Sequence, residues 1–156
     1  MTLLVQWELF PGLRASYTEE EAIESSYVFI TSTLGARSVE SATAVFEVHP
    51  KVVDFGTLIL ELDSAPDSQR RSIAVARAGL GAPLEPRKRF VERIGECAFD
   101  QDSRVREGAL WAMTYAEWPV FRKVLRTVAD EDDDPYLRDF AQETLESFDA
   151  LGVGEQ

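Results

Sequence analysis

An octet of the form Asp-[Ser/Pro]-x-x-Arg-x-x-Ala occurs three times in this chain, at residues 67–74, 102–109 and 134–141. The octets begin 35 and then 32 residues apart. A near-constant period of this length is typical of proteins built from stacked repeats, each of which buries its apolar face against its neighbours. The octets therefore constrain the fold more than any other feature, although a repeat fold does not by itself specify an activity.

Each octet has the composition of a helix start. Aspartate is a preferred N-cap because its carboxylate accepts the free amide protons of the first helical turn. Pro135 suits the first helical position, where its missing amide proton costs nothing. Apolar residues then return at helical spacing after each octet. We expect helices at 68–80, 103–116 and 135–148.

A further helix is expected before each octet, because a proline lies near the start of each preceding apolar stretch. These expected helices run from Pro50 to about Leu62, from Pro86 to Phe99 and from Pro119 to Ala129. Three helix–turn–helix repeats would then cover 50–80, 86–116 and 119–148.

Residues 1–48 are interpreted as a degenerate N-terminal helical cap of the same stack. Thr18 and Glu21 form a capping box, and an apolar stripe at helical spacing follows until Gly35. A second helix is expected after it, with Ser38 and Ala44 aligned under the first octet. Residues 1–12 fit an extended segment or a short helix equally well, and residues 149–156 are taken as a tail.

Paired helices, a proline near the start of the first and an Asp-x-x-x-Arg-x-x-Ala octet in the second resemble the HEAT repeat, in its short bacterial form. The resemblance implies a single all-α domain, a HEAT-like α-α superhelix (solenoid) of about three and a half helical-hairpin repeats. It also implies a ladder of ion pairs between repeats made by the octet residues, which are Asp67, Asp102, Asp134, Arg71, Arg106 and Arg138.

The charge of the chain favours a basic partner. The formal net charge is −12, and the two acidic segments 1–66 and 94–156 enclose a basic segment, 67–93. Such a balance makes nucleic acid and anionic membranes poor partners and a basic protein surface a good one. The alternative is that the arginines of residues 70–93 bind DNA phosphates, as in HEAT-type glycosylases, unless they pair with the acidic flanks or lie on a solvated face.

Catalytic and metal-binding motifs are missing from the sequence. The single histidine, His49, precedes Pro50 and is interpreted as a turn residue, because HEAT-type hydroxylases need paired His-Glu dipeptides to bind iron. Cys97 is the only cysteine and is expected to be buried and structural. We therefore expect no enzymatic activity, no cofactor and no metal, with a HEAT-type enzyme or accessory lyase as the alternative.

Two groups of residues are candidates for binding a partner protein. Five consecutive acids, residues 130–134, exceed what helix capping requires. Trp111 lies on a second face of its expected helix, where a tryptophan among polar residues is a binding hot-spot candidate. Packing of Trp111 over Leu110 or against Trp118 is an equally good interpretation. The partner-binding candidates are Glu107, Trp111, Tyr115, Asp130, Glu131, Asp132, Asp133, Tyr136, Asp139 and Glu143.

We therefore expect a non-enzymatic module that binds a basic partner protein. An immunity protein or antitoxin that neutralises a basic toxin fits this style of sequence, and an adaptor in a larger assembly fits it nearly as well. The N-terminus lacks the basic residues of a signal peptide and no apolar run is long enough to span a membrane, so a cytoplasmic location is expected.

Overall fold

The computed structural model describes residues 3–49 and 51–154. The chain divides into two compact units, Met1–Asp54 and Phe55–Gln156, which are described separately below. Pro50, where a helix is expected to begin, lies outside the described residues.

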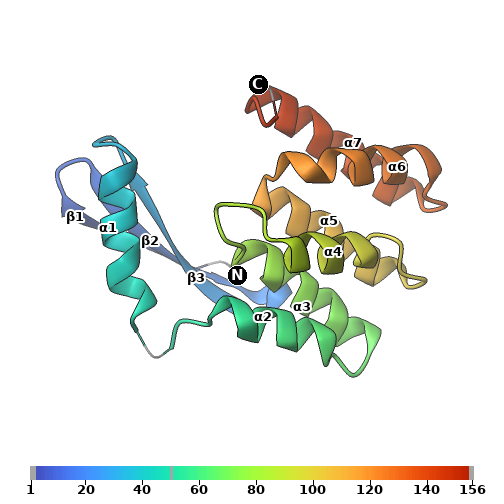
Figure 1. Cartoon of the computed structure of the whole chain (residues 1–156), viewed down its shortest axis with the longest axis horizontal. Helices are drawn as coiled ribbons and strands as arrows, with labels where there is room; N and C mark the ends of the chain where they lie inside the picture. The colour runs from blue at the N-terminus through green and yellow to red at the C-terminus, as the bar shows by residue number, and fades with distance from the viewer. Residues whose placement is uncertain (1–2, 50, 155–156) are drawn as a thin grey trace. The chain divides into compact units, whose positions relative to one another are not determined.

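The first unit is built on a three-stranded antiparallel sheet (Figure 1). Strands β1 (Leu3–Phe10), β2 (Leu13–Glu20) and β3 (Ser25–Ser32) follow one another in the order β1-β2-β3. Gly12 makes the tight β1–β2 turn possible, because its φ of 83° is a left-handed conformation that other residues rarely adopt. A short 3₁₀ helix, η1 (Glu21–Ile23), connects β2 to β3.

One helix accompanies this sheet. Helix α1 (Ala36–Glu47) packs against β3 and buries Ala42. The hydroxyl groups of Ser32 and Ser38 lie 2.6 Å apart where the strand leads into the helix. Ala15 on the central strand is fully buried, whereas β1 exposes most of its apolar side chains. The buried core of this unit is therefore small.

The prediction of an all-α, HEAT-like solenoid of three and a half repeats is wrong, because the chain has a mixed α/β structure. The segment expected as the first helix of the cap instead contains the end of β2, η1 and all of β3. Residues 25–32 are rich in β-branched and aromatic residues, which favour strands. Their apolar positions, from Tyr27 to Ile30, also satisfy a helical spacing over this short window, so periodicity alone did not separate the two structures.

The second unit consists of three helical hairpins (Figure 1). They are α2 (Phe55–Asp63) with α3 (Ser68–Leu80), α4 (Lys88–Cys97) with α5 (Ser103–Ala116), and the pair η2 (Pro119–Phe121) plus α6 (Arg122–Glu131) with α7 (Pro135–Ala150). The expected second helices are confirmed, with the last one continuing to Ala150. Two of the first helices are shorter than expected, and the third starts as a 3₁₀ turn.

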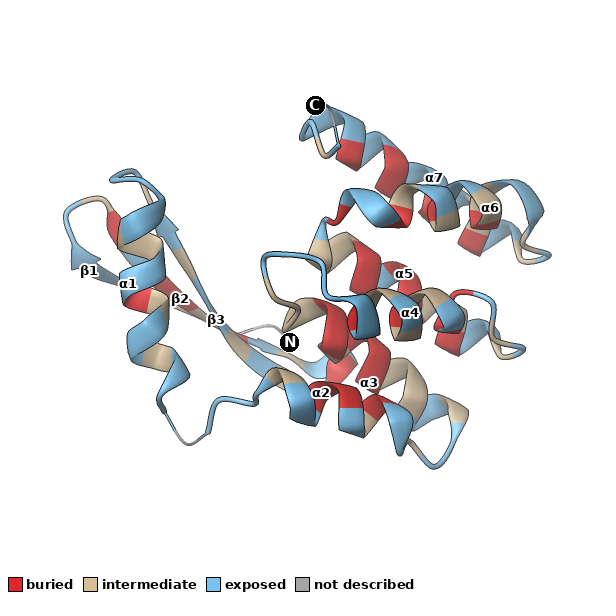
Figure 2. Cartoon of the chain, viewed as in Figure 1, coloured by how far each residue is buried: buried red, intermediate tan, exposed pale blue. Residues whose placement is uncertain are grey.

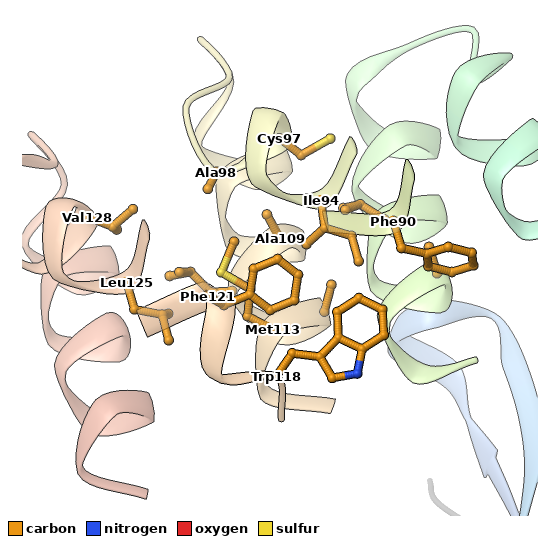
Figure 3. Close-up of a cluster of buried hydrophobic side chains, with 14 of the residues drawn as sticks. Phe90, Ile94, Cys97, Ala98, Ala109, Met113, Trp118, Phe121, Leu125 and Val128 are labelled. Atoms are coloured by element: carbon orange, nitrogen blue, oxygen red, sulfur yellow. The ribbon is translucent and has the colours of Figure 1, made fainter. Parts of the chain in front are cut away.

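The hairpins stack so that the second helices α3, α5 and α7 pack in one layer and α2 packs against α4 in the other. The buried residues of this unit, coloured red in Figure 2, are distributed over the helices of both layers. At the centre, the Trp118 ring stacks on Phe121 with centroids 5.6 Å apart and meets the edge of Phe90 at 6.3 Å (Figure 3). Among the described residues, none of the helices is long and apolar enough to cross a membrane.

Candidate protein-binding surface

The three octet aspartates are helix caps. Asp67 accepts a hydrogen bond from the amide of Arg70 at 2.8 Å, Asp102 from that of Arg104 at 3.0 Å, and Asp134 from that of Tyr136 at 3.0 Å. Each bond satisfies an amide of the first helical turn that has no partner within the helix. The octet aspartates thus fix where the second helices begin.

Two of the three octet arginines connect one hairpin to the next, whereas Arg138 donates to the Asp132 carbonyl of its own hairpin at 2.6 Å. Arg71 contacts Asp100 at 3.4 Å, and Arg106 holds Asp132 with two hydrogen bonds, of 2.8 and 3.0 Å. The resemblance implies the octet aspartates as acceptors. The structure instead uses Asp100 and Asp132, the residues two positions before the octets of the second and third hairpins.

Among the octet arginines, Arg106 makes the most extensive set of hydrogen bonds. Its side chain is only 12 % exposed, and its Nη1 also donates to the backbone carbonyls of Asp100 and Gln101. Burial alone would raise the pKa of Asp132, but the hydrogen bonds from Arg106 and from the amide of Asp134 hold it below its usual value. Arg106 therefore joins the turns of two successive hairpins.

The acidic turn, residues 130–134, comprises the last two residues of α6 and the residues that lead into α7, and it divides between structure and surface. The Asp132 carboxylate is 5 % exposed and bound by Arg106, so it belongs to the ladder. Asp133 also contacts Arg106, at 3.1 Å, but remains 95 % exposed. Asp130 and Glu131 are exposed as well. Three of the four candidates in this turn are thus accessible to a partner, and Asp132 is not.

A shallow pocket of about 280 Å³ opens beside this turn. Its walls come from the turns and helix ends of the second and third hairpins, and include Phe99, Thr127, Glu131 and Asp133. Phe99 is 56 % exposed there. The pocket therefore combines an exposed ring with accessible carboxylates.

Two glycines set the spacing between α3 and α5. A Cβ atom on Gly79 would overlap the backbone of Ala112, and one on Gly108 would lie 2.5 Å from the carbonyl oxygen of Ser72. Ser72 in turn donates a hydrogen bond of 2.7 Å to the carbonyl of Arg104. The two helices therefore touch backbone to backbone.

The α5–α7 interface is different, because Phe140 occupies the octet position that Gly108 holds in α5. Trp111 packs its ring edge-on to Phe140, with centroids 4.8 Å apart. A hydrogen bond of 3.3 Å between the hydroxyls of Thr114 and Thr144 completes the contact further along. Bulky rings thus separate α7 from α5 where glycine lets α3 approach.

These rings form an accessible aromatic surface. Trp111 is 40 % exposed and stacks on Tyr115 at 5.9 Å, while Tyr136 is 56 % exposed and lies 6.3 Å from Phe140. Trp118, the other expected neighbour, is instead buried against Phe90 and Phe121. Trp111 therefore packs between hairpins and faces solvent at the same time.

Carboxylates border this aromatic surface. Glu107 accepts a hydrogen bond of 3.1 Å from the Tyr136 hydroxyl. Burial raises the pKa of that hydroxyl, and the nearby carboxylates of Glu107, Glu143 and Asp134 raise it further. Asp139 is exposed on α7. The α5–α7 surface is defined here as the four rings with their acids: Glu107, Trp111, Tyr115, Tyr136, Asp139, Phe140 and Glu143.

Phe140 is the member that sequence reasoning missed. It follows Tyr136 by four residues, the spacing that places two side chains on the same helical face. The candidates on α7 were predicted from the helix face that carries Trp111 on α5, and Phe140 aligns with Gly108, which lies outside that face. Its role depends on the spacing between two helices, which only the structure supplies.

The basic segment is largely neutralised within its own unit. Asp63 binds Arg89 at 2.8 Å and Arg93 at 2.6 Å, and Glu61 binds Arg77 at 3.2 Å. Arg87 lies 4.5 Å from the ring centroid of Phe55, a cation–π geometry. Most of the cations that the DNA-binding alternative needs are therefore engaged by neighbouring residues.

The two remaining residues with reactive side chains, Cys97 and His49, lie in a buried core and in a turn. Cys97 is buried, as expected, and burial raises the pKa of its thiol, which disfavours the reactive thiolate. His49 accepts a hydrogen bond of 3.3 Å from the amide of Lys51 in its turn. In the described part of the chain, no three metal-binding side chains come together to hold an ion.

No family model, curated protein or solved structure matches this chain.

Proposed function

We propose that this chain is a non-enzymatic protein-binding module whose α5–α7 surface receives a basic partner protein. The observation that carries the proposal is the exposure of Trp111 and Tyr136 beside the carboxylates of Glu107 and Glu143. Aromatic rings supply large, rigid contact area, and a border of one charge selects partners of the opposite charge.

The acidic turn adds negative charge that acts in the same direction as the carboxylates of the α5–α7 surface. Asp130, Glu131 and Asp133 are accessible and carry charge that attracts a basic partner before contact. The neutralised basic segment supports the same choice, because its arginines are engaged by Asp63, Glu61 and Phe55. These observations favour a basic protein over nucleic acid as the ligand.

Two biological roles fit such a module. An immunity protein or antitoxin neutralises a basic toxin by covering it, and an adaptor holds a basic subunit within an assembly. The proposed compartment is the cytoplasm, because the only cysteine is buried and no disulfide can form within one chain. The likeness to the HEAT repeat stays a prediction that rests on the three octets.

Site-specific photo-crosslinking in the native host tests the proposal. A photoreactive phenylalanine analogue at Tyr115 should crosslink a basic protein, whereas the same analogue at Arg126, exposed on α6, should not. Crosslinking that is equal at both positions, or that captures an acidic protein or nucleic acid, would reject the α5–α7 surface as the binding site.

With the partner identified, two pairs of substitutions that remove the same charge test whether the carboxylates of the α5–α7 surface attract it. Asp139→Asn with Glu143→Gln should slow association. Glu40→Gln with Glu47→Gln, on exposed positions of α1, makes the same change in net charge and should not. Equal slowing by the two pairs would show that only the net charge matters, and would contradict a localised site.

A further inference from the structure

In the described part of the chain, no cation pairs with the exposed carboxylates that α7 contributes to the α5–α7 surface. These carboxylates belong to Asp139 and Glu143. The arginines in the first turns of the two helices are engaged elsewhere, because Arg104 pairs with Asp102 at 2.6 Å and Arg138 donates to a backbone carbonyl at 2.6 Å. The negative charge of this surface is therefore available to a cation from outside the chain.

The aromatic rings of the same surface are also open to a cation. Trp111 is 40 % exposed and Tyr136 is 56 % exposed. The cation–π contacts that the described residues form use the rings of Phe55 and Phe148 instead of these two. The face of an aromatic ring attracts positive charge, and that of tryptophan attracts it most strongly. The rings and the carboxylates therefore favour the same kind of ligand.

One ligand group can contact a ring and a carboxylate together. The ring centroids of Trp111 and Phe140 lie 4.8 Å apart, and Glu143 follows Phe140 by three residues, a spacing that makes two side chains neighbours on a helix. Nearby, Tyr136 donates a hydrogen bond of 3.1 Å to Glu107 across the two helices. The surface therefore brings rings and acids within reach of a single long side chain.

Of the two basic side chains, arginine fits this arrangement better than lysine. The guanidinium group is planar and weakly hydrated, so it can stack on an aromatic ring while the N–H groups at its edge donate to a carboxylate. The ammonium group of lysine is a compact, strongly hydrated charge that cannot stack in this way. Carboxylates alone would accept either side chain, so the exposed rings are what distinguish the two.

We propose that the α5–α7 surface recognises an arginine side chain of its partner, with the guanidinium stacked on the exposed ring of Trp111 and paired with the carboxylate of Glu143. This recognition rests on the proposed function, because it specifies the group by which the basic partner is held. Tryptophan and arginine are both enriched among the residues that dominate the binding energy of protein interfaces.

Two peptides of equal charge test the choice of arginine on the intact chain. Hexa-arginine should bind at least about threefold more tightly than hexa-lysine, the difference that a cation–π contact at an exposed site provides. In nitrogen–proton correlation spectra, hexa-arginine should shift the indole signal of Trp111 and leave that of the buried Trp118 in place. Equal affinities, including no binding by either peptide, or an unshifted Trp111 signal overturn arginine recognition. Crosslinking at Tyr115 decides the proposed function separately.

Matched variants locate the arginine on the surface, with circular dichroism to establish that each is folded. Trp111→Leu should remove the preference for hexa-arginine, whereas Trp7→Leu, at an exposed tryptophan of β1, should retain it. Glu143→Gln should weaken hexa-arginine binding by about twofold or more, and Glu146→Gln, also exposed on α7, should weaken it less. A preference that survives in Trp111→Leu, or equal weakening by the two glutamine variants, overturns the proposed contacts.

Discussion

Arg106 on α5 binds both carboxylate oxygens of Asp132 in the turn before α7, with Nε–Oδ2 at 2.8 Å and Nη2–Oδ1 at 3.0 Å. The paired geometry orients the turn between α6 and α7 relative to the preceding hairpin. Such two-point pairing of a guanidinium with a carboxylate is stronger and more directional than a single hydrogen bond.

Removal of Arg106 should lower the stability of the protein. Arg106→Ala should decrease the free energy of unfolding by about 1–3 kcal/mol, because Asp132 and two backbone carbonyls lose their donor. Chemical denaturation measures the change. Arg71→Ala is the matched comparison and should cost less, because the Arg71 side chain is 37 % exposed and its contact with Asp100 is 3.4 Å. An equal or larger loss in Arg71→Ala would contradict this ranking.

The same ion pair predicts a dependence of stability on acid. The pKa of Asp132 is lower in the folded protein than its ordinary value, so ionised Asp132 favours the folded state. This contribution is fully present above pH 4 or so, falls below it, and is lost once the pH drops through the folded pKa. Asp132→Asn should therefore flatten the decline of the unfolding free energy as the pH falls below about 4. A variant that declines as steeply as the wild type would contradict the role of this carboxylate.

Two glycine substitutions should change the stability of the protein in opposite directions. Gly108→Ala should destabilise by about 1–3 kcal/mol despite the better helix propensity of alanine, because the new methyl group would lie 2.5 Å from the Ser72 carbonyl oxygen. Gly95→Ala, in α4, should stabilise by up to about 1 kcal/mol, because nothing lies within 4 Å of the added Cβ. Thermal melts of the two variants compare them directly, and a rise in melting temperature for Gly108→Ala would show that α3 and α5 are not in such close contact.

The binding proposal predicts that the exposed acids of the acidic turn and the ring of Trp111 affect different rate constants. The amide variants of Asp130, Glu131 and Asp133 should slow association with the partner and reduce its dependence on salt. Trp111→Ala should instead speed dissociation by about 30-fold or more, the size expected for a hot-spot aromatic. Surface plasmon resonance over a range of salt concentrations resolves the two. Binding that is insensitive to salt, or a Trp111 variant that changes only the association rate, would contradict the proposed division.

The octets predicted the second helices almost to the residue, because capping and helical spacing are local properties of the sequence. Asp67, Asp102 and Asp134 all cap as expected. The acceptors of the arginine ladder had a local signal that was overlooked: Asp100 and Asp132 both precede an octet aspartate by two residues, whereas the first octet has Ala65 there.

The helix expected after Gly35 is confirmed as α1, but the helix expected between Thr18 and Gly35 is wrong for a physical reason. The strand Ser25–Ser32 has apolar residues on consecutive positions, so it lacks the strict alternation of a half-buried strand. Its pairing with β2 is a tertiary property that local spacing does not reveal. The sequence predicted that aromatic and acidic residues of α5 and α7 would share a surface. The place of Phe140 in that surface and the burial of Asp132 against Arg106 depend on contacts between hairpins, which local spacing does not reveal.

The exchange of Gly108 for Phe140 between successive hairpins has a consequence for how such a surface arises. Where α3 meets α5, small residues let the helices close completely, and neither helix leaves an aromatic ring between them. Where α5 meets α7, one large side chain keeps the helices apart, and the rings that fill the interval remain open to solvent on their outer side. Recognition and tight closure are thus competing uses of the same kind of junction, and the position six residues after the octet aspartate, glycine in α5 and phenylalanine in α7, is one place where the two junctions differ.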